Sequence, residues 1–71
     1  MEQILAGILE AIEDEMNAQN HYKKLAEQAE DPSIKNFFEQ LRLEEEQHEN
    51  ILRTRYQAFS KMSDANKENR K

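Results

Sequence analysis

The chain contains no cysteine, and its 71 residues include a single glycine and a single proline. Without cysteine, disulfides and thiolate zinc sites are both excluded. A chain of this length forms one domain at most, and it buries too little surface to be very stable alone. Self-association, a metal bound through oxygen and nitrogen, or both are the remaining ways to stabilise it.

An excess of positive charge and a long apolar run are also missing. The 15 acidic and 10 basic residues give a formal net charge of -5. This balance argues against nucleic acid and anionic membranes as partners, and it favours attraction of cations. No apolar run approaches a membrane span, and the first residues lack the layout of a signal peptide. We therefore expect a cytoplasmic protein, with enclosure inside a larger cytoplasmic shell as the alternative.

The remaining composition is rich in helix-forming residues, and one break divides it. The sequence AEDPS at residues 29–33 offers Asp31 as a helix N-cap and Pro32 as a first helical residue. The predicted fold class is all-α, an antiparallel two-helix hairpin. The predicted elements are a first helix at about 3–29, a turn at 30–32, a second helix at about 32–62 within a domain of residues 1–62, and a polar tail at 63–71.

Each predicted helix carries a stripe of core positions at steps of about three and four residues. Glu15 lies on the first stripe, and Glu45 and His48 fill a gap in the second. Glu44 and Glu49 flank the second stripe, where charged residues are usually solvated surface, and lining an entry route is their alternative role. The other stripe positions are Leu5, Ile8, Ile12, Gln19, Tyr22, Ala26 and Ala29 on the first helix, and Ile34, Phe38, Leu41, Leu52, Phe59 and Met62 on the second.

Three ionisable side chains at core positions need an explanation, because an unpaired buried carboxylate is costly. Taken singly, an inward glutamate can pair with an arginine, and an inward histidine is usually a satisfied core residue. Taken together, Glu45 and His48 form Glu-x-x-His one turn apart, facing Glu15 on the other helix. A carboxylate and an imidazole at that spacing can converge on one ion. No lysine or arginine lies in phase nearby, so the combination favours a metal site.

The ligand set of one hairpin is half of a known pattern. Di-iron carboxylate bundles use one glutamate from each of two helices and a Glu-x-x-His from each of two more. Two copies of this chain supply that set, and pairing also covers apolar stripes that a lone hairpin exposes. We therefore expect a homodimer at minimum, closed into a four-helix bundle.

The segments EMNAQNHYKKLAEQAEDP and FFEQLRLEEEQH resemble the ferritin-like superfamily, specifically rubrerythrin-type helical pairs. Tyr22 follows Glu15 at the family's spacing, the turn holds Asp31-Pro32, and Glu45-x-x-His48 comes after it. The pattern is especially similar to the encapsulated ferritins, which are two-helix half-ferritins. The resemblance covers about residues 8–56.

This resemblance implies a ferroxidase-type oxidoreductase that oxidises Fe(II) with dioxygen or peroxide, in iron handling or protection from oxidative stress. Glu15, Glu45 and His48 from two chains would ligate two irons, with Glu45 bridging. Mn and Zn are possible substitutes. Tyr22 would hydrogen-bond a ligand carboxylate or take part in electron transfer, and a core aromatic is its alternative role. The resemblance also makes a ring of dimers and an encapsulin shell candidate assemblies.

The chain departs from these families at several positions. Without cysteine it has no rubredoxin-type iron. Asp14 matches an acid that acts in metal uptake, whereas Asn17 stands where another acid is expected and His21 replaces a common aromatic. The C-terminal KENRK is not a hydrophobic docking peptide for a shell.

A metal-free reading competes with the di-iron one. In it the hairpin dimerises as an interaction module, and Glu15 and Glu45 hydrogen-bond across the interface. Bound metal and Fe(II) oxidation separate the two readings.

Overall fold

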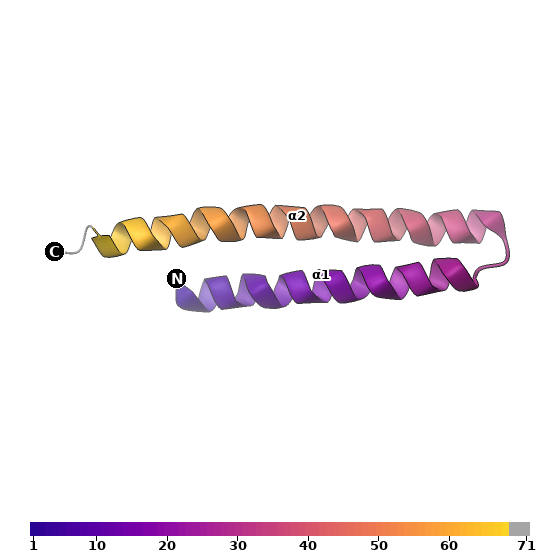
Figure 1. The fold of residues 1–71 in the computed structure, drawn as a ribbon, viewed down its shortest axis with the longest axis horizontal. Helices are drawn as coiled ribbons and strands as arrows, with labels where there is room; N and C mark the ends of the chain where they lie inside the picture. Colours follow the sequence, from indigo (N-terminus) through magenta and orange to yellow (C-terminus); the bar gives the residue numbers. More distant parts are fainter. Residues whose placement is uncertain (69–71) are drawn as a thin grey trace.

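The computed structural model describes the backbone of residues 1–68 and the side chains of residues 1–64. Two helices make up this part of the chain, α1 (Glu2–Gln28) and α2 (Pro32–Glu68). They run antiparallel, side by side, and α2 continues past the start of α1 (Figure 1). The predicted all-α antiparallel hairpin is confirmed. Neither helix has an apolar stretch long enough to cross a membrane, among the residues described.

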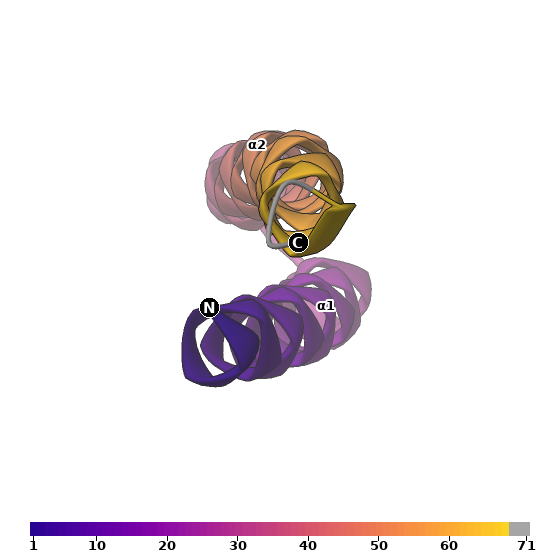
Figure 2. The same ribbon diagram turned by 90° about the vertical axis from the view of Figure 1, so that its left-hand side faces the viewer.

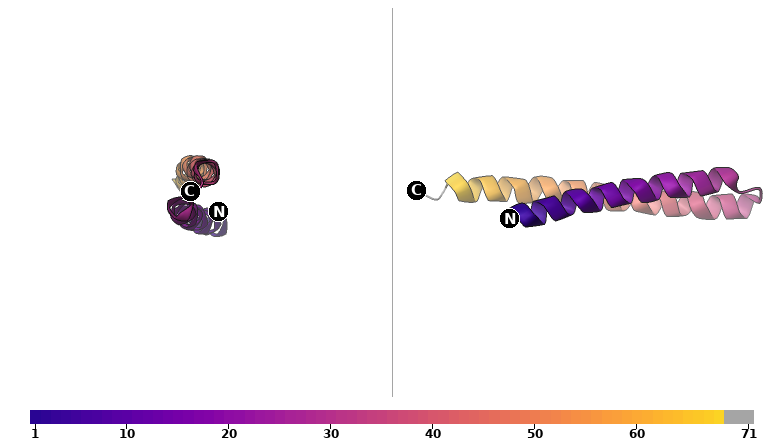
Figure 3. Two further views of the ribbon diagram at one scale, coloured as in Figure 1. Left: turned by 90° about the vertical axis from the view of Figure 1, so that its right-hand side faces the viewer. Right: turned by 90° about the horizontal axis from the view of Figure 1, so that it is seen from below.

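The hairpin is long and thin, with extents of 62 × 14 × 10 Å. Viewed along the length of the hairpin, α1 is inclined to α2, so the axes of the two antiparallel helices cross at an angle (Figure 2). The view from below shows the same shallow crossing (Figure 3). One helix pair in contact along a single seam leaves the outer faces of both helices uncovered.

The turn follows the local chemistry expected from AEDPS. Ala29 leaves the helical region with φ −71° and ψ 125°, and its N–H still donates to the carbonyls of Leu25 and Ala26. Asp31 then caps α2, since its Oδ1 accepts hydrogen bonds from the Ser33 N–H at 2.8 Å and the Ser33 hydroxyl at 2.5 Å. These bonds hold the pKa of the Asp31 carboxyl below its ordinary value.

The second helix is longer than its predicted span. It was expected to end near residue 62, and it continues to Glu68. No glycine or proline follows Pro32, so nothing in the sequence stops the helix where the apolar stripe ends. Part of the predicted tail is therefore helical, and its last residues, 69–71, lie outside the described part of the chain.

Few side chains are fully buried in the seam where α1 and α2 meet. Among residues 1–64 only Ile12 and Ala26 are buried hydrophobic residues. Ile34 and Met62, expected on the core stripe, are exposed. Tyr56, absent from the predicted stripe, is half-buried. The residues of α2 that face α1 therefore differ from the stripe inferred from periodicity. That stripe combined residues from two different sides of the helix.

Replacing Asp31 with alanine should lower the melting temperature by a few degrees, because the first turn of α2 loses its capping oxygen. Asp31→Asn keeps an acceptor and should lose much less. The pKa of Asp31 is lower in the folded protein than in the unfolded chain. The ionised Asp31 therefore contributes its full stabilisation at pH values above the ordinary carboxyl pKa, and this stabilisation is lost as the pH falls through the pKa of the folded protein. Circular dichroism melts at pH 7 and pH 3 test this. Equal melting of wild type and Asp31→Ala at pH 7 would contradict it.

Candidate metal centre

Glu15, Glu45 and His48 meet near the middle of the helix pair. Each offers one ligand atom, and these atoms all lie within 4.8 Å of one another. His48 Nδ1 is 3.6 Å from Glu15 Oε2 across the seam and 3.6 Å from Glu45 Oε2 on its own helix. Glu45 and His48 share a side of α2 because they are one helical turn apart. The structure thus brings together the three residues that the sequence suggested as ligands.

The two distances from His48 Nδ1 to the carboxylates fit ligands of a shared ion better than they fit hydrogen bonds. At 3.6 Å, neither contact of His48 Nδ1 is a hydrogen bond. Two donors on one metal ion, each about 2.0–2.2 Å from it, lie at most roughly 4 Å apart. The two His48 contacts fall inside that limit, whereas the 4.8 Å that bounds the whole group exceeds it, so a shared ion would draw the most widely separated pair of ligand atoms closer. Carboxylate oxygen and imidazole nitrogen are also a donor set that suits iron, zinc and manganese.

One oxygen of this group has no partner of its own. Glu15 Oε2 is shielded from solvent and accepts no hydrogen bond within the described part of the chain. No lysine or arginine in that part forms an ion pair with Glu15 or Glu45 either. Buried polar atoms are normally hydrogen-bonded, so an oxygen without a hydrogen-bond partner beside a second carboxylate and an imidazole is placed where a cation could be held. The residues present therefore fit a metal ion.

The three side chains are not equally covered. The Glu15 and Glu45 side chains are 23% and 22% exposed, whereas the His48 side chain is 56% exposed. The expectation that His48 occupies a core position was wrong for the single hairpin. The predicted stripe on α2 is wider than one neighbouring helix can cover. As a result α1 covers Glu45 and leaves His48 exposed at the edge of the stripe.

The other residues singled out from the sequence are not part of this group. The Tyr22 ring is stacked on Phe38 with centroids 6.5 Å apart, and it is 6.0 Å from the His21 ring. No hydrogen bond joins the Tyr22 hydroxyl to a carboxylate in the described residues, and a role for Tyr22 beside a bound metal stays a prediction. Asp14 and Asn17 are exposed on α1.

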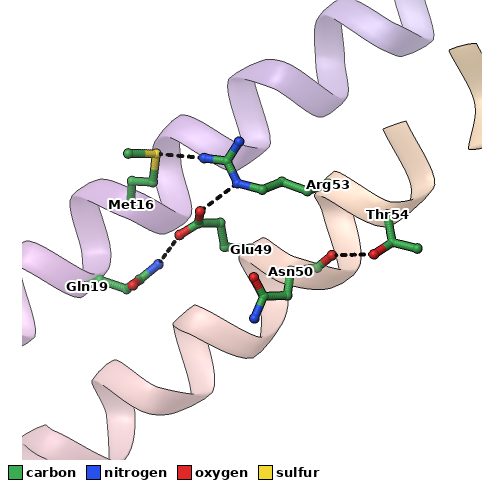
Figure 4. A network of polar contacts seen from close by, with 6 residues as sticks. All are labelled: Met16, Gln19, Glu49, Asn50, Arg53 and Thr54. Atoms are coloured by element: carbon green, nitrogen blue, oxygen red, sulfur yellow. Dashed lines mark hydrogen bonds and ion pairs between the residues drawn. The ribbon is translucent and has the colours of Figure 1, made fainter. Parts of the chain in front are cut away.

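Glu49 has a role that sequence reasoning missed. It accepts a hydrogen bond from Gln19 Nε2 at 2.7 Å and another from Arg53 Nε at 2.6 Å (Figure 4). These bonds, with that from Gln19 the larger effect, lower the pKa of the Glu49 carboxyl. The Glu49–Arg53 spacing of four residues was a usable signal. Gln19 had been placed on the apolar stripe without a partner.

Comparison with known families bears on this geometry. Residues 8–71 match the sequence model of the family described as Rubrerythrin. The chain belongs to the rubrerythrin family. Searches of the curated proteins and of the solved structures give no significant match. The narrower similarity of this rubrerythrin-family hairpin to encapsulated ferritins stays a prediction.

Family membership and the residue group agree at a general level. A rubrerythrin-type domain indicates a ferritin-like, di-iron function and an iron-dependent redox role. The group of Glu15, Glu45 and His48 supplies a potential metal site in the same domain.

If the role of Glu15 is to bind a metal, its carboxylate should lower the free energy of unfolding of the metal-free protein. Glu15→Met, which is similar in volume, should raise the free energy of unfolding of the metal-free protein by about 1 kcal/mol, because it removes an unsatisfied carboxylate oxygen. Glu13→Met, at an exposed neighbouring position, should change it little. Urea denaturation after dialysis against a chelator measures both. A loss of stability in Glu15→Met would show that the carboxylate is satisfied in the metal-free protein.

Proposed function

We propose that two copies of this chain pair around two iron ions and oxidise Fe(II) with dioxygen or peroxide. The observation that carries the proposal is the unpartnered Glu15 Oε2, 3.6 Å from His48 Nδ1 and facing the Glu45 carboxylate. A carboxylate in that setting is explained by a bound cation. Membership in the rubrerythrin family makes iron the first candidate, while the same donors accept Mn(II) and Zn(II).

The chain's own side chains have defined tasks in this proposal. Glu15 and Glu45 bind in their ionised forms and balance the charge of the cation. His48 binds in its neutral form through a ring nitrogen, so affinity falls as acidity protonates the three ligands. When bound, paired iron supplies one electron from each Fe(II) to the oxidant. The half-buried position of the two carboxylates limits their contact with water and strengthens their attraction for the cation.

A second copy is needed because one hairpin holds half of the ligands that a di-iron bundle uses. The exposed side of α2 supports such pairing. Phe37 is 58% exposed and Ile51 is 59% exposed. At about 100° per residue both lie within roughly 60° of His48 around α2. Pairing through this side would bury the apolar residues and the open edge of the metal group together. The ring of dimers and the encapsulin shell stay predictions from the resemblance alone.

Ligand removal tests the activity. Glu45→Ala should lower the rate of Fe(II) oxidation by more than about tenfold, since the loss of even an outer partner of a ligand costs roughly 10–100-fold. Glu46→Ala removes an exposed acid paired with Arg42 at 3.7 Å, and it should leave the rate unchanged. Absorbance of Fe(III) formed under air reports the rate.

Metal-linked stability gives an independent check. Anaerobic Fe(II) at a hundredfold excess over Kd should stabilise wild type by about 2.7 kcal/mol, with no effect on Glu45→Ala. A wild type that neither responds to Fe(II) nor oxidises it would favour the metal-free dimerisation module.

The pairing surface is tested with two matched substitutions on α2. Ile51→Arg places a charge on the side that carries His48, so it should yield a monomer with Fe(II) oxidation reduced more than about tenfold. Leu43→Arg changes a residue of comparable size that is 43% exposed and lies roughly 140° away from His48 around the helix. It should remain a dimer with full activity. Sedimentation velocity measures the state. A monomeric wild type, or dimers of both variants, would contradict this interface.

A further inference from the structure

The hydrogen bonds of Glu49 form a link between the two helices beside the metal group. The Glu49 side chain is only 17% exposed, and both of its oxygens are used. Arg53 continues the link, since its Nη2 lies 3.4 Å from the sulfur of Met16 on α1. Figure 4 shows Glu49 lying between the helices, with Gln19 on one side and Arg53 on the other.

This link has a fixed relation to the ligands. Gln19 and Glu49 are 30 residues apart. Glu15 and Glu45 have the same separation, each one helical turn earlier in the sequence, although these turns run in opposite directions along the antiparallel pair. Glu49 is also the residue after His48. The bond from Gln19 to Glu49 therefore joins the two backbone segments that carry the ligands.

Little else in the hairpin fixes the helices at this point. The bonds from Gln19 to Glu49 and from Arg53 to Met16 are the side-chain hydrogen bonds that cross the seam within residues 1–64. Apolar packing is non-directional, and fully buried apolar residues are few. Without a metal, the Glu15 and Glu45 carboxylates repel each other, which pushes the helices apart at the site. A bond that holds the helices together there opposes the repulsion.

We propose that Glu49 is a positioning residue, which holds α1 and α2 at the separation that lets Glu15 share an ion with Glu45 and His48. The inference rests on the proposed metal-binding function and goes beyond it. Glu49 itself touches no ligand atom in this role. Its effect is to prepare the site before the metal arrives, which raises affinity by reducing the cost of bringing two carboxylates together.

The test uses a donor–acceptor exchange. Glu49→Ala removes both bonds. The double variant Gln19→Glu with Glu49→Gln reverses the pair, so that an amide on α2 donates to a carboxylate on α1 and still offers an oxygen to Arg53. Glu46→Ala, on the same helix but paired only with Arg42, is the control. Anaerobic calorimetry with Fe(II) on the metal-free full chain gives the affinity of each.

We expect Glu49→Ala to weaken Fe(II) binding by roughly tenfold or more, as for other partners that orient ligands. The Fe(II) affinity of the exchanged pair should return to within about threefold of the wild-type affinity, and the affinity of Glu46→Ala should equal that of wild type. The shift in melting temperature on adding Fe(II) should shrink in Glu49→Ala. If Glu49→Ala does not fold, Glu49→Gln alone, which loses the charge-assisted bonds, should bind Fe(II) more weakly than the exchanged pair, which restores a carboxylate to the link.

A purely structural Glu49 gives a different pattern. Glu49→Ala would then melt lower with and without Fe(II) by the same amount and bind Fe(II) as wild type does, which would overturn the inference while leaving the proposed function intact. Absence of Fe(II) binding by wild type would overturn both.

Discussion

One carboxylate oxygen, Glu15 Oε2, has no hydrogen-bond partner among the described residues, and the proposed assembly of the hairpin depends on it. Glu15 Oε2 is shielded from water and lies 3.6 Å from an imidazole nitrogen, too far for a hydrogen bond. Three other acids have ordinary partners: Asp31 caps a helix, Glu46 pairs with Arg42 in solvent, and Glu49 is doubly hydrogen-bonded. Glu15, which lies beside Glu45 and His48, has no such partner for its Oε2 in the described residues, and the proposed cation would provide one.

The small core of the hairpin and its single group of three ligand residues both fit the proposed pairing of two copies. A hairpin with few buried apolar residues gains little from packing alone. The same hairpin leaves His48 and neighbouring apolar residues at an open edge of α2. A second copy placed there would supply both the missing apolar surface and the missing ligands. Folding, assembly and metal binding would then be linked, because each would depend on the same contact between hairpins.

Much of this organisation could be predicted from the sequence, for identifiable reasons. The single proline with an adjacent capping aspartate placed the turn, and helical spacing brought Glu45 and His48 together opposite Glu15. The end of α2 was predicted too early because the apolar pattern fades well before any residue that stops a helix. Periodicity also assigned His48, Ile34 and Met62 to one buried stripe. A stripe records which residues favour burial, and it cannot separate the side of α2 that meets α1 from a side left open to other contacts.

Glu49 illustrates a different limit. Its pairing with Arg53 follows from helical spacing, but its bond with Gln19 depends on how two long side chains reach across the crossing helices. Such contacts depend on the relative rotation of α1 and α2, which the pattern of apolar residues specifies only coarsely.

The most direct test of the central claim is anomalous scattering at the iron edge from crystals grown anaerobically with Fe(II). The account predicts two adjacent peaks beside a two-fold axis, each bordered by Glu15, Glu45 and His48, with both hairpins contributing. Crystals of an isolated hairpin, or iron peaks remote from Glu15 with its carboxylate hydrogen-bonded instead, would contradict it.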